Sequence, residues 1–175
     1  MEKFFKKKPQ LPSPLEGTSH GSYEVNLQNL PADPGLRPCI DSYNCNIRDQ
    51  VRRTYLQRGP FQPKGHNFKF EKFGNQQRRF VSDWFKEFGS WLEYSIKEES
   101  AYCLFCYLFK EDNGDQAGSD TLTRKGFKNW KEKEKLKIHE GGVNSAHNRA
   151  WQKCERLMNK KQHTATCFER QSEKT

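Results

Sequence analysis

The sequence predicts an α+β fold, in which a small β-hairpin packs against two or more helices between disordered tails. The first observation is polarity: 33% of the 175 residues are hydrophobic, 30% are charged and the mean hydropathy is −1.11. A single large core across the whole chain is therefore not expected. The second is the aromatic content, since 13 Phe, 6 Tyr and 4 Trp can anchor a small core. The third is the order of patterns, because a hairpin pattern precedes two helical ones.

Composition divides the chain into four segments. Residues 1–35, with five prolines among Ser, Gly and charged residues, are predicted to be a disordered tail. Residues 36–65 form a short segment with one helix, residues 66–161 the main domain, and residues 162–175 a flexible tail. The lysine run at residues 6–8 could serve nuclear import, although a solvated tail explains it equally well.

The cellular compartment is predicted from what the sequence lacks. The amino-terminal residues have no apolar signal segment, and no stretch reaches the roughly 18 apolar residues of a membrane span. We therefore expect no membrane association and a reducing compartment, the cytosol or nucleus, with the nucleus preferred. There, six cysteines are expected to be free or metal-bound rather than joined in disulfides.

The hydrophobic pattern places the elements in order. Ile47, Val51, Tyr55 and Leu56 recur at helical spacing before Gly59-Pro60 ends that helix. Phe80, Trp84, Phe85 and Phe88 predict one or two further helical turns that end at Gly89. Residues 91–96 read as a strand, 97–100 as a turn and 101–103 as the returning strand.

The carboxyl-terminal half is predicted to contain a loop and two basic helices. The loop covers the acidic, glycine-containing residues 111–118. The first helix is expected at about residues 126–138 with Phe127 and Trp130 inward, and the second at about residues 145–161. Asn144, in the turn at residues 140–144, is the predicted cap of the second helix.

Four residues form the pattern C-x2-C-x32-H-x7-H: Cys103, Cys106, His139 and His147. Two thiolates three positions apart and two imidazoles at adjacent helix ends can complete a tetrahedral Zn²⁺ site. A redox C-x-x-C and a pair of buried, inert cysteines are the alternatives from spacing. Cys154 is a possible substitute ligand, but its helical phase favours the core. The predicted α+β fold is therefore a small zinc-organised finger.

Several separated motifs resemble the TTF-type zinc finger of plant hAT-superfamily transposases. They are Trp84-Phe85, residues 91–95, Cys103-x2-Cys106 with residues 107–109, residues 126–131, His139-Glu140, and Asn144-Ser145-x-His147-Asn148. The likeness covers roughly residues 33–162. It implies the ligand set Cys103, Cys106, His139 and His147, and a finger that binds transposon ends. It also implies that strand transfer belongs to a separate domain, so this chain resembles a truncated or domesticated copy that is not an enzyme.

The charge distribution favours DNA as the partner. The formal net charge is +9, and residues 124–161 hold twelve Lys/Arg against four Asp/Glu. The candidate phosphate contacts are Arg124, Lys125, Lys128, Lys131, Lys135, Arg149 and Lys153. A zinc-stabilised protein-interaction module is the rival function, and an enzyme is disfavoured because a closed site activates no water. The oligomeric state stays open, a homo-oligomer included.

Overall fold

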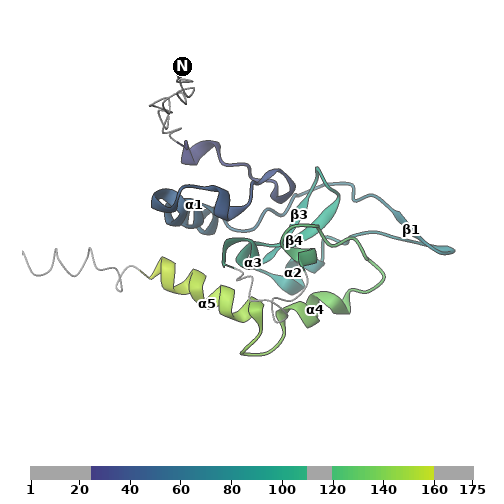
Figure 1. Ribbon diagram of the computed structural model, residues 1–175. Coiled ribbons are helices and arrows are strands. Elements are labelled where there is room, and N and C mark those ends of the chain that lie inside the picture. Colours follow the sequence, from purple (N-terminus) through teal and green to yellow (C-terminus); the bar gives the residue numbers. More distant parts are fainter. Residues whose placement is uncertain (1–24, 110–119, 160–175) are drawn as a thin grey trace, which may run out of the picture.

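The computed structural model describes residues 25–109 and 120–159. Within them the fold is α+β, as predicted, with five α-helices and two antiparallel hairpins (Figure 1). The helices are α1 (Cys45–Arg58), α2 (Trp84–Phe88), α3 (Leu104–Phe109), α4 (Glu134–Glu140) and α5 (Ala146–Met158). The strands are β1 (Glu71–Phe73), β2 (Gln76–Arg78), β3 (Leu92–Ser95) and β4 (Ser100–Cys103). Short 3₁₀ turns are η1 (Leu27–Asn29), η2 (Pro34–Leu36), η3 (Ile40–Ser42) and η5 (Asp120–Leu122).

The β3–β4 hairpin lies at the centre, with α1 on one side and α4 and α5 on the other (Figure 1). All eight of its strand residues are buried, and its register pairs Leu92 with Cys103. The sequence predicted this hairpin with boundaries one residue different. Because β4 runs directly into α3, the hairpin delivers Cys103 and Cys106 to the same place.

Helix α1 confirms the predicted helix around Val51 and extends it at both ends. Asn44 caps its start by accepting a hydrogen bond from the amide of Asn46 at 3.0 Å. Gly59 ends it with φ of 72°, a conformation that favours glycine. Val51 and Tyr55 are buried in the same core as the central hairpin, so the predicted separation of residues 36–65 from the main domain has no counterpart in packing.

The predicted amino-terminal tail is too long. Residues 25–35, assigned to it from composition, pack against α1, and Leu30 and Pro34 are buried. Arg58 donates to the carbonyls of Leu27, Gln28 and Leu30 at 2.8–3.0 Å. These contacts join residues about 30 positions apart, which proline content alone could not indicate. Residues 1–24 and 160–175 lie outside the described residues, as does the predicted loop at 111–118.

The first basic helix begins later than predicted. Instead of a helix from residue 126, Phe127 forms an antiparallel bridge with Ala101, and α4 begins at Glu134. Gly126 has φ of 80°, and a Cβ there would lie 2.3 Å from the Ser100 hydroxyl. Glycine is therefore the residue that lets the chain turn onto the hairpin at this point. Phe127 and Trp130 are nevertheless buried, as predicted.

Helix α5 has its predicted place but a different cap. Ser145, not Asn144, caps it by accepting from the amide of Asn148 at 3.0 Å. The hydroxyl suits this position because it also donates to the Glu140 carbonyl at 2.6 Å. The helix ends at Met158 within the described residues. No helix among residues 25–109 and 120–159 is long and apolar enough to cross a membrane.

An aromatic core holds these elements together. The Phe80 ring is its hub, with ring centroids at 5.1 Å from Trp84, 4.8 Å from Tyr94 and 5.6 Å from Trp130. These residues come from α2, β3 and the loop before α4. The prediction that rings anchor a small core is confirmed.

Candidate metal centre

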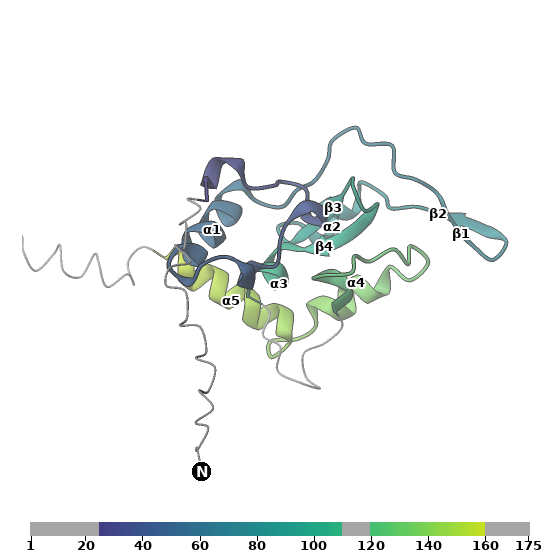
Figure 2. The same ribbon diagram turned by 45° about the horizontal axis from the view of Figure 1, so that its top comes forward.

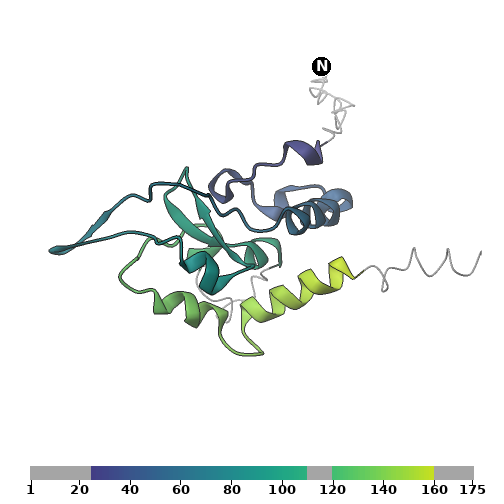
Figure 3. The ribbon, with the colours of Figure 1, turned by 180° about the vertical axis from the view of Figure 1, so that it is seen from behind.

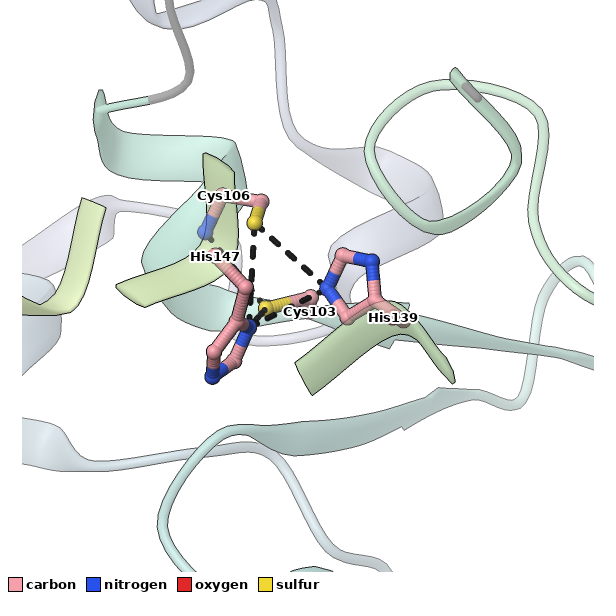
Figure 4. A group of neighbouring side chains, drawn as sticks. All are labelled: Cys103, Cys106, His139 and His147. Atoms are coloured by element: carbon pink, nitrogen blue, oxygen red, sulfur yellow. Dashed lines mark hydrogen bonds between the residues drawn. The ribbon is translucent and has the colours of Figure 1, made fainter. Parts of the chain in front are cut away.

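Two cysteines and two histidines from four elements meet beside the central hairpin (Figure 4). Cys103 ends β4, Cys106 lies in the first turns of α3, His139 lies near the end of α4, and His147 lies in the first turn of α5. One ligand atom from each residue lies within 4.8 Å of all the others. The structure therefore brings together all four residues that the sequence predicted as ligands.

The distances suit a tetrahedral ion. Zinc bonds of about 2.3 Å to sulfur and about 2.0 Å to nitrogen would place S and N about 3.5 Å apart and two nitrogens about 3.3 Å apart. The His147 Nδ1 atom lies 3.4 Å from Cys103 Sγ and 3.9 Å from Cys106 Sγ. The His139 Nε2 atom lies 3.5 Å from Cys106 Sγ and 3.1 Å from His147 Nδ1. Four of the six separations are thus close to the tetrahedral values and the other two lie within 4.8 Å, so the donor set fits such an ion.

Aromatic rings line the candidate centre, and three of its four residues are buried while His139 is half-buried. Cys103 and Cys106 are buried, and His147 retains 8% exposure. The Trp91 ring lies 5.4 Å from His139 and 5.1 Å from His147, and its indole N–H donates to Glu140 at 2.7 Å. Trp91 thus fixes both imidazoles from one side, a role that sequence reasoning did not assign to it.

Local hydrogen bonds hold the ligand-bearing turns in place. The Cys106 amide points at Cys103 Sγ from 3.5 Å, and the Leu104 amide donates to the Trp91 carbonyl at 2.9 Å. Gly141, with φ of 59°, ends α4 directly after the His139 turn, and Ser145 then caps α5. Backbone geometry therefore sets the approach of both histidines.

The electrostatics of the two thiols differ. The pKa of Cys106 is lowered to about 3, chiefly because the Cys103 thiol donates to its sulfur and further because both imidazoles face it. Burial raises the pKa of Cys103. The site thus favours a thiolate at Cys106 even before the charge of a metal cation is added.

The other cysteines and histidines stand apart from this cluster. Cys154 is buried in the core, in agreement with its helical phase, and burial raises its pKa to about 12. Cys39 and Cys45 are free and exposed. His66 lies against Glu99, with the closest N and O atoms 3.6 Å apart. His20, His163 and Cys167 lie outside the described residues.

A second buried polar centre joins the amino-terminal segment to β3. The Arg37 guanidinium donates to both carboxylate oxygens of Glu93 at 2.7 Å, and the Phe61 amide donates to the same carboxylate at 2.8 Å. The Arg37 and Glu93 side chains are 2% and 0% exposed. The guanidinium also lies 4.5 Å from the centre of the Tyr55 ring. Sequence reasoning missed this pair because its members lie 56 positions apart, with no motif between them.

The seven candidate DNA contacts come from several segments. Arg124 and Lys125 follow η5, and Lys128 and Lys131 lie in the loop before α4, not on a helix as predicted. Lys135 is on α4, and Arg149 and Lys153 are on α5. Lys153 is half-buried, whereas the other six are exposed.

Some cations of this basic stretch already have partners. Lys135 forms an ion pair with Glu132, and Arg149 donates to the Asn144 carbonyl at 3.4 Å. Lys133 and Lys137, which were not among the candidates, both pair with Glu87 on α2. Lys125 and Lys128 are exposed and form no ion pair with the described residues. The loop before α4 therefore offers more available positive charge than the helix itself.

Comparison with known proteins gives two relationships. The family model described as "ZMYM1/FAM200, RNase-like domain" (DUF4371) matches residues 120–175. Zinc finger MYM-type protein 5 of Homo sapiens and of Macaca fascicularis are each 33% identical to the chain over 109 residues. The chain is similar to zinc finger MYM-type proteins. That alignment covers 58% of this chain and 14% of each relative.

Each likeness covers less than two thirds of this chain. The family match begins within the predicted 66–161 domain and includes His139 and His147, whereas both cysteines precede it. The domain name describes a fold and carries no statement about activity. No solved structure gives a significant match.

Proposed function

We propose that this chain carries a structural zinc centre that organises a DNA-binding module. The observation that carries the proposal is the convergence of Cys103, Cys106, His139 and His147 within 4.8 Å. Two thiolates with two imidazoles in a tetrahedral arrangement are the donor set of structural zinc sites. In this role the ion, when bound, cross-links the β4–α3 corner to α4 and α5.

The same geometry supports a binding role and not an enzymatic one. Catalytic zinc sites keep one position open for water or substrate, whereas four protein donors close the coordination sphere. We therefore propose no catalytic residue in this part of the chain.

The exposed cations supply the expected contact with DNA. Lys125, Lys128 and Lys131 lie on the loop that the Phe127 bridge joins to the hairpin. Residues 124–161 together carry twelve Lys/Arg and four Asp/Glu, the imbalance expected of a surface that meets phosphates. We further propose a TTF-type finger related to those of plant hAT transposases, acting in the nucleus. The relatives are named as zinc finger proteins, which agrees with this proposal.

The zinc proposal is tested by the metal content of the purified protein. We expect one Zn²⁺ per chain, and we expect Cys103→Ser to lose it. Cys39→Ser is the matched control, since Cys39 is exposed and outside the cluster. Wild-type protein that holds no zinc after purification and zinc titration would contradict the proposal.

The DNA proposal is tested by salt dependence. On duplex DNA the slope of log K against log salt is roughly −0.9 for each phosphate neutralised, so Lys128→Ala with Lys131→Ala should flatten it by up to about two units. Binding to all sequences should weaken alike, with zinc content unchanged. Lys97→Ala is the control, because it removes a positive charge from an exposed position outside this loop and outside the β1–β2 hairpin. Unaltered affinity and slope in the Lys128 and Lys131 variant would make this loop a solvated surface.

A protein-interaction module is the second candidate. Ile138 and Val143 are each 74% exposed and lie on both sides of His139 in the sequence. Apolar side chains beside a zinc centre suit a protein partner. Wild-type protein that binds no duplex DNA at low salt would favour this candidate. A homo-oligomer is one form of it, and sedimentation of Ile138→Ser against the wild type would test that form.

A further inference from the structure

The β1–β2 hairpin stands away from the rest of the molecule. In all three ribbon views it extends beyond the body as a narrow two-stranded ribbon (Figures 1, 2 and 3). Its sheet contains no third strand, and every residue of β2 is exposed. No sequence pattern predicts an element at residues 67–79, so this ribbon is a feature that only the structure reveals.

The base of the ribbon is fixed to the body. Phe68, which precedes β1, is buried against Phe80 and Tyr94, with ring centroids 4.9 Å and 4.8 Å away. The Arg79 guanidinium, which follows β2, lies 4.5 Å from the centre of the Phe70 ring. A free two-stranded hairpin is marginal in water, so these anchors at its base direct the ribbon outward as a unit.

The two faces of the ribbon differ. The register pairs Lys72 with Gln77, and alternation places Phe70 and Arg79 on the same face. All four of these side chains belong to exposed residues, and none is acidic. The opposite face carries Glu71 and Phe73, which are half-buried, beside Gln76 and Arg78. The first face, called here the Lys72 face, therefore offers cations, an amide and a ring to a partner.

The cations of the Lys72 face have no acidic partner among the described residues. Lys72 and Arg79 form no ion pair with other described residues, whereas Lys69, nearby, pairs with Glu99 at 3.2 Å. At the base of the ribbon an open depression has Lys64, Arg79 and Lys86 among its lining residues. Positive charge thus continues from the ribbon onto the body at Lys64 and Arg79, whereas Lys86 pairs with Asp83 at 2.8 Å, and an extended row of cations suits a polyanion better than a single acidic side chain.

We propose that the Lys72 face enters the major groove of duplex DNA and reads base edges there. The inference rests on the proposed DNA-binding function and names a second element for it, remote in sequence from Lys128. The major groove admits a two-stranded ribbon, and a Gln amide pairs with the adenine edge in two hydrogen bonds. Gln77 is the base-reading residue, and Lys72 and Arg79 hold the phosphates on either side.

The test uses the full zinc-loaded chain and a random-sequence duplex DNA pool, from which the wild type selects its preferred sites. Gln77→Ala should reduce the preference for the selected site over a mismatched one by about 5-fold to about 150-fold. Lys72→Ala should weaken binding to every duplex and flatten the salt slope by about 0.9. Gln76→Ala, on the opposite face of the same strand, is the matched control and should change neither quantity.

The outcomes separate the inference from the function on which it rests. If the wild type binds duplex DNA but Gln77→Ala and Lys72→Ala keep its affinity, slope and preferred site, the inference is overturned and the DNA-binding function stands. If the wild type binds no duplex DNA, both are overturned. A photoreactive amino acid in place of Asn75, at the ribbon tip, tests the position of the ribbon on DNA independently of these variants. The same amino acid in place of Ile96, which is exposed, is the control. Crosslinks from Asn75 to DNA bases support the inference, and crosslinks from Ile96 alone contradict it.

Discussion

The metal centre and the Arg37–Glu93 pair both join distant parts of the chain to the β3–β4 hairpin, but they balance their charges differently. The candidate metal centre connects β4 and α3 to α4 and α5, and in the proposed function its two cysteines bind a cation from outside the chain. The ion pair connects the amino-terminal segment to β3, and its two charges neutralise each other. The stability of the part around the candidate metal centre should therefore depend on the supply of metal, whereas the stability of the part around Arg37 and Glu93 should not.

The largest expected effect is loss of the metal. Chelation of the zinc-loaded protein should unfold the region around the hairpin, because structural zinc contributes on the order of 10 kcal/mol to folding in small domains. Near-ultraviolet circular dichroism measures this directly, since Trp91 packs against both imidazoles. A spectrum unchanged by chelation, while the metal is shown to be removed, would mean that the site has no structural role.

The ion pair should give the next largest effect. Glu93→Gln leaves the Arg37 charge buried without its partner, which should lower the free energy of unfolding by about 3–5 kcal/mol. Urea unfolding of the zinc-loaded protein measures the loss, and Glu98→Gln, at an exposed position, is the control. Replacing both partners, as in Arg37→Met with Glu93→Leu, should restore most of the stability. If the free energy of unfolding of Glu93→Gln lies within about 1 kcal/mol of the wild-type value, as for a typical surface substitution, this account is contradicted.

Cys154 provides a test of the metal centre alone, because it is a buried cysteine that does not belong to the Cys103–Cys106–His139–His147 cluster. Cys154→Ala should cost about 1–2 kcal/mol through lost packing while zinc content stays the same. Cys106→Ala, in contrast, should lose zinc. Equal zinc loss in the two variants would place Cys154 among the ligands.

The smallest effect concerns the turn that positions His147. Ser145→Ala removes the cap of α5 and the hydrogen bond to the Glu140 carbonyl, and should cost about 1 kcal/mol. We expect a weaker zinc affinity with unchanged stoichiometry, measured by competition with a chelator. Asn144→Ala, at the position predicted from the sequence as the cap, should have the smaller effect.

Sequence patterns sufficed where chemistry recurs at fixed spacing. Cys103 and Cys106 are three positions apart, and His139 and His147 lie at the facing ends of two predictable helices. The structure brings these four together. The aromatic spacing from Phe80 to Phe88 likewise predicted α2 and its end at Gly89.

The errors arose where the fold depends on contacts between distant residues. Arg37 finds Glu93 across 56 positions, and Arg58 orders residues 27–30, so neither contact has a local signal. The start of α4 was misplaced because Phe127 extends the hairpin, a tertiary interaction that overrides helical periodicity. The β1–β2 ribbon is polar on its exposed face, so hydrophobic alternation could not reveal it.

The position of the four candidate ligands along the chain also determines how the protein can be divided. A fragment of residues 25–109 carries both cysteines, and a fragment of residues 120–159 carries both histidines, so neither has a complete donor set. Helix α5 contacts α3 and α1, so apolar surface would be exposed on both fragments after separation. Mixed together, the two should reassociate in a stoichiometric complex only when zinc is present. The family match from residue 120 thus begins in the middle of one hydrophobic core, and the metal would join two chemically incomplete halves.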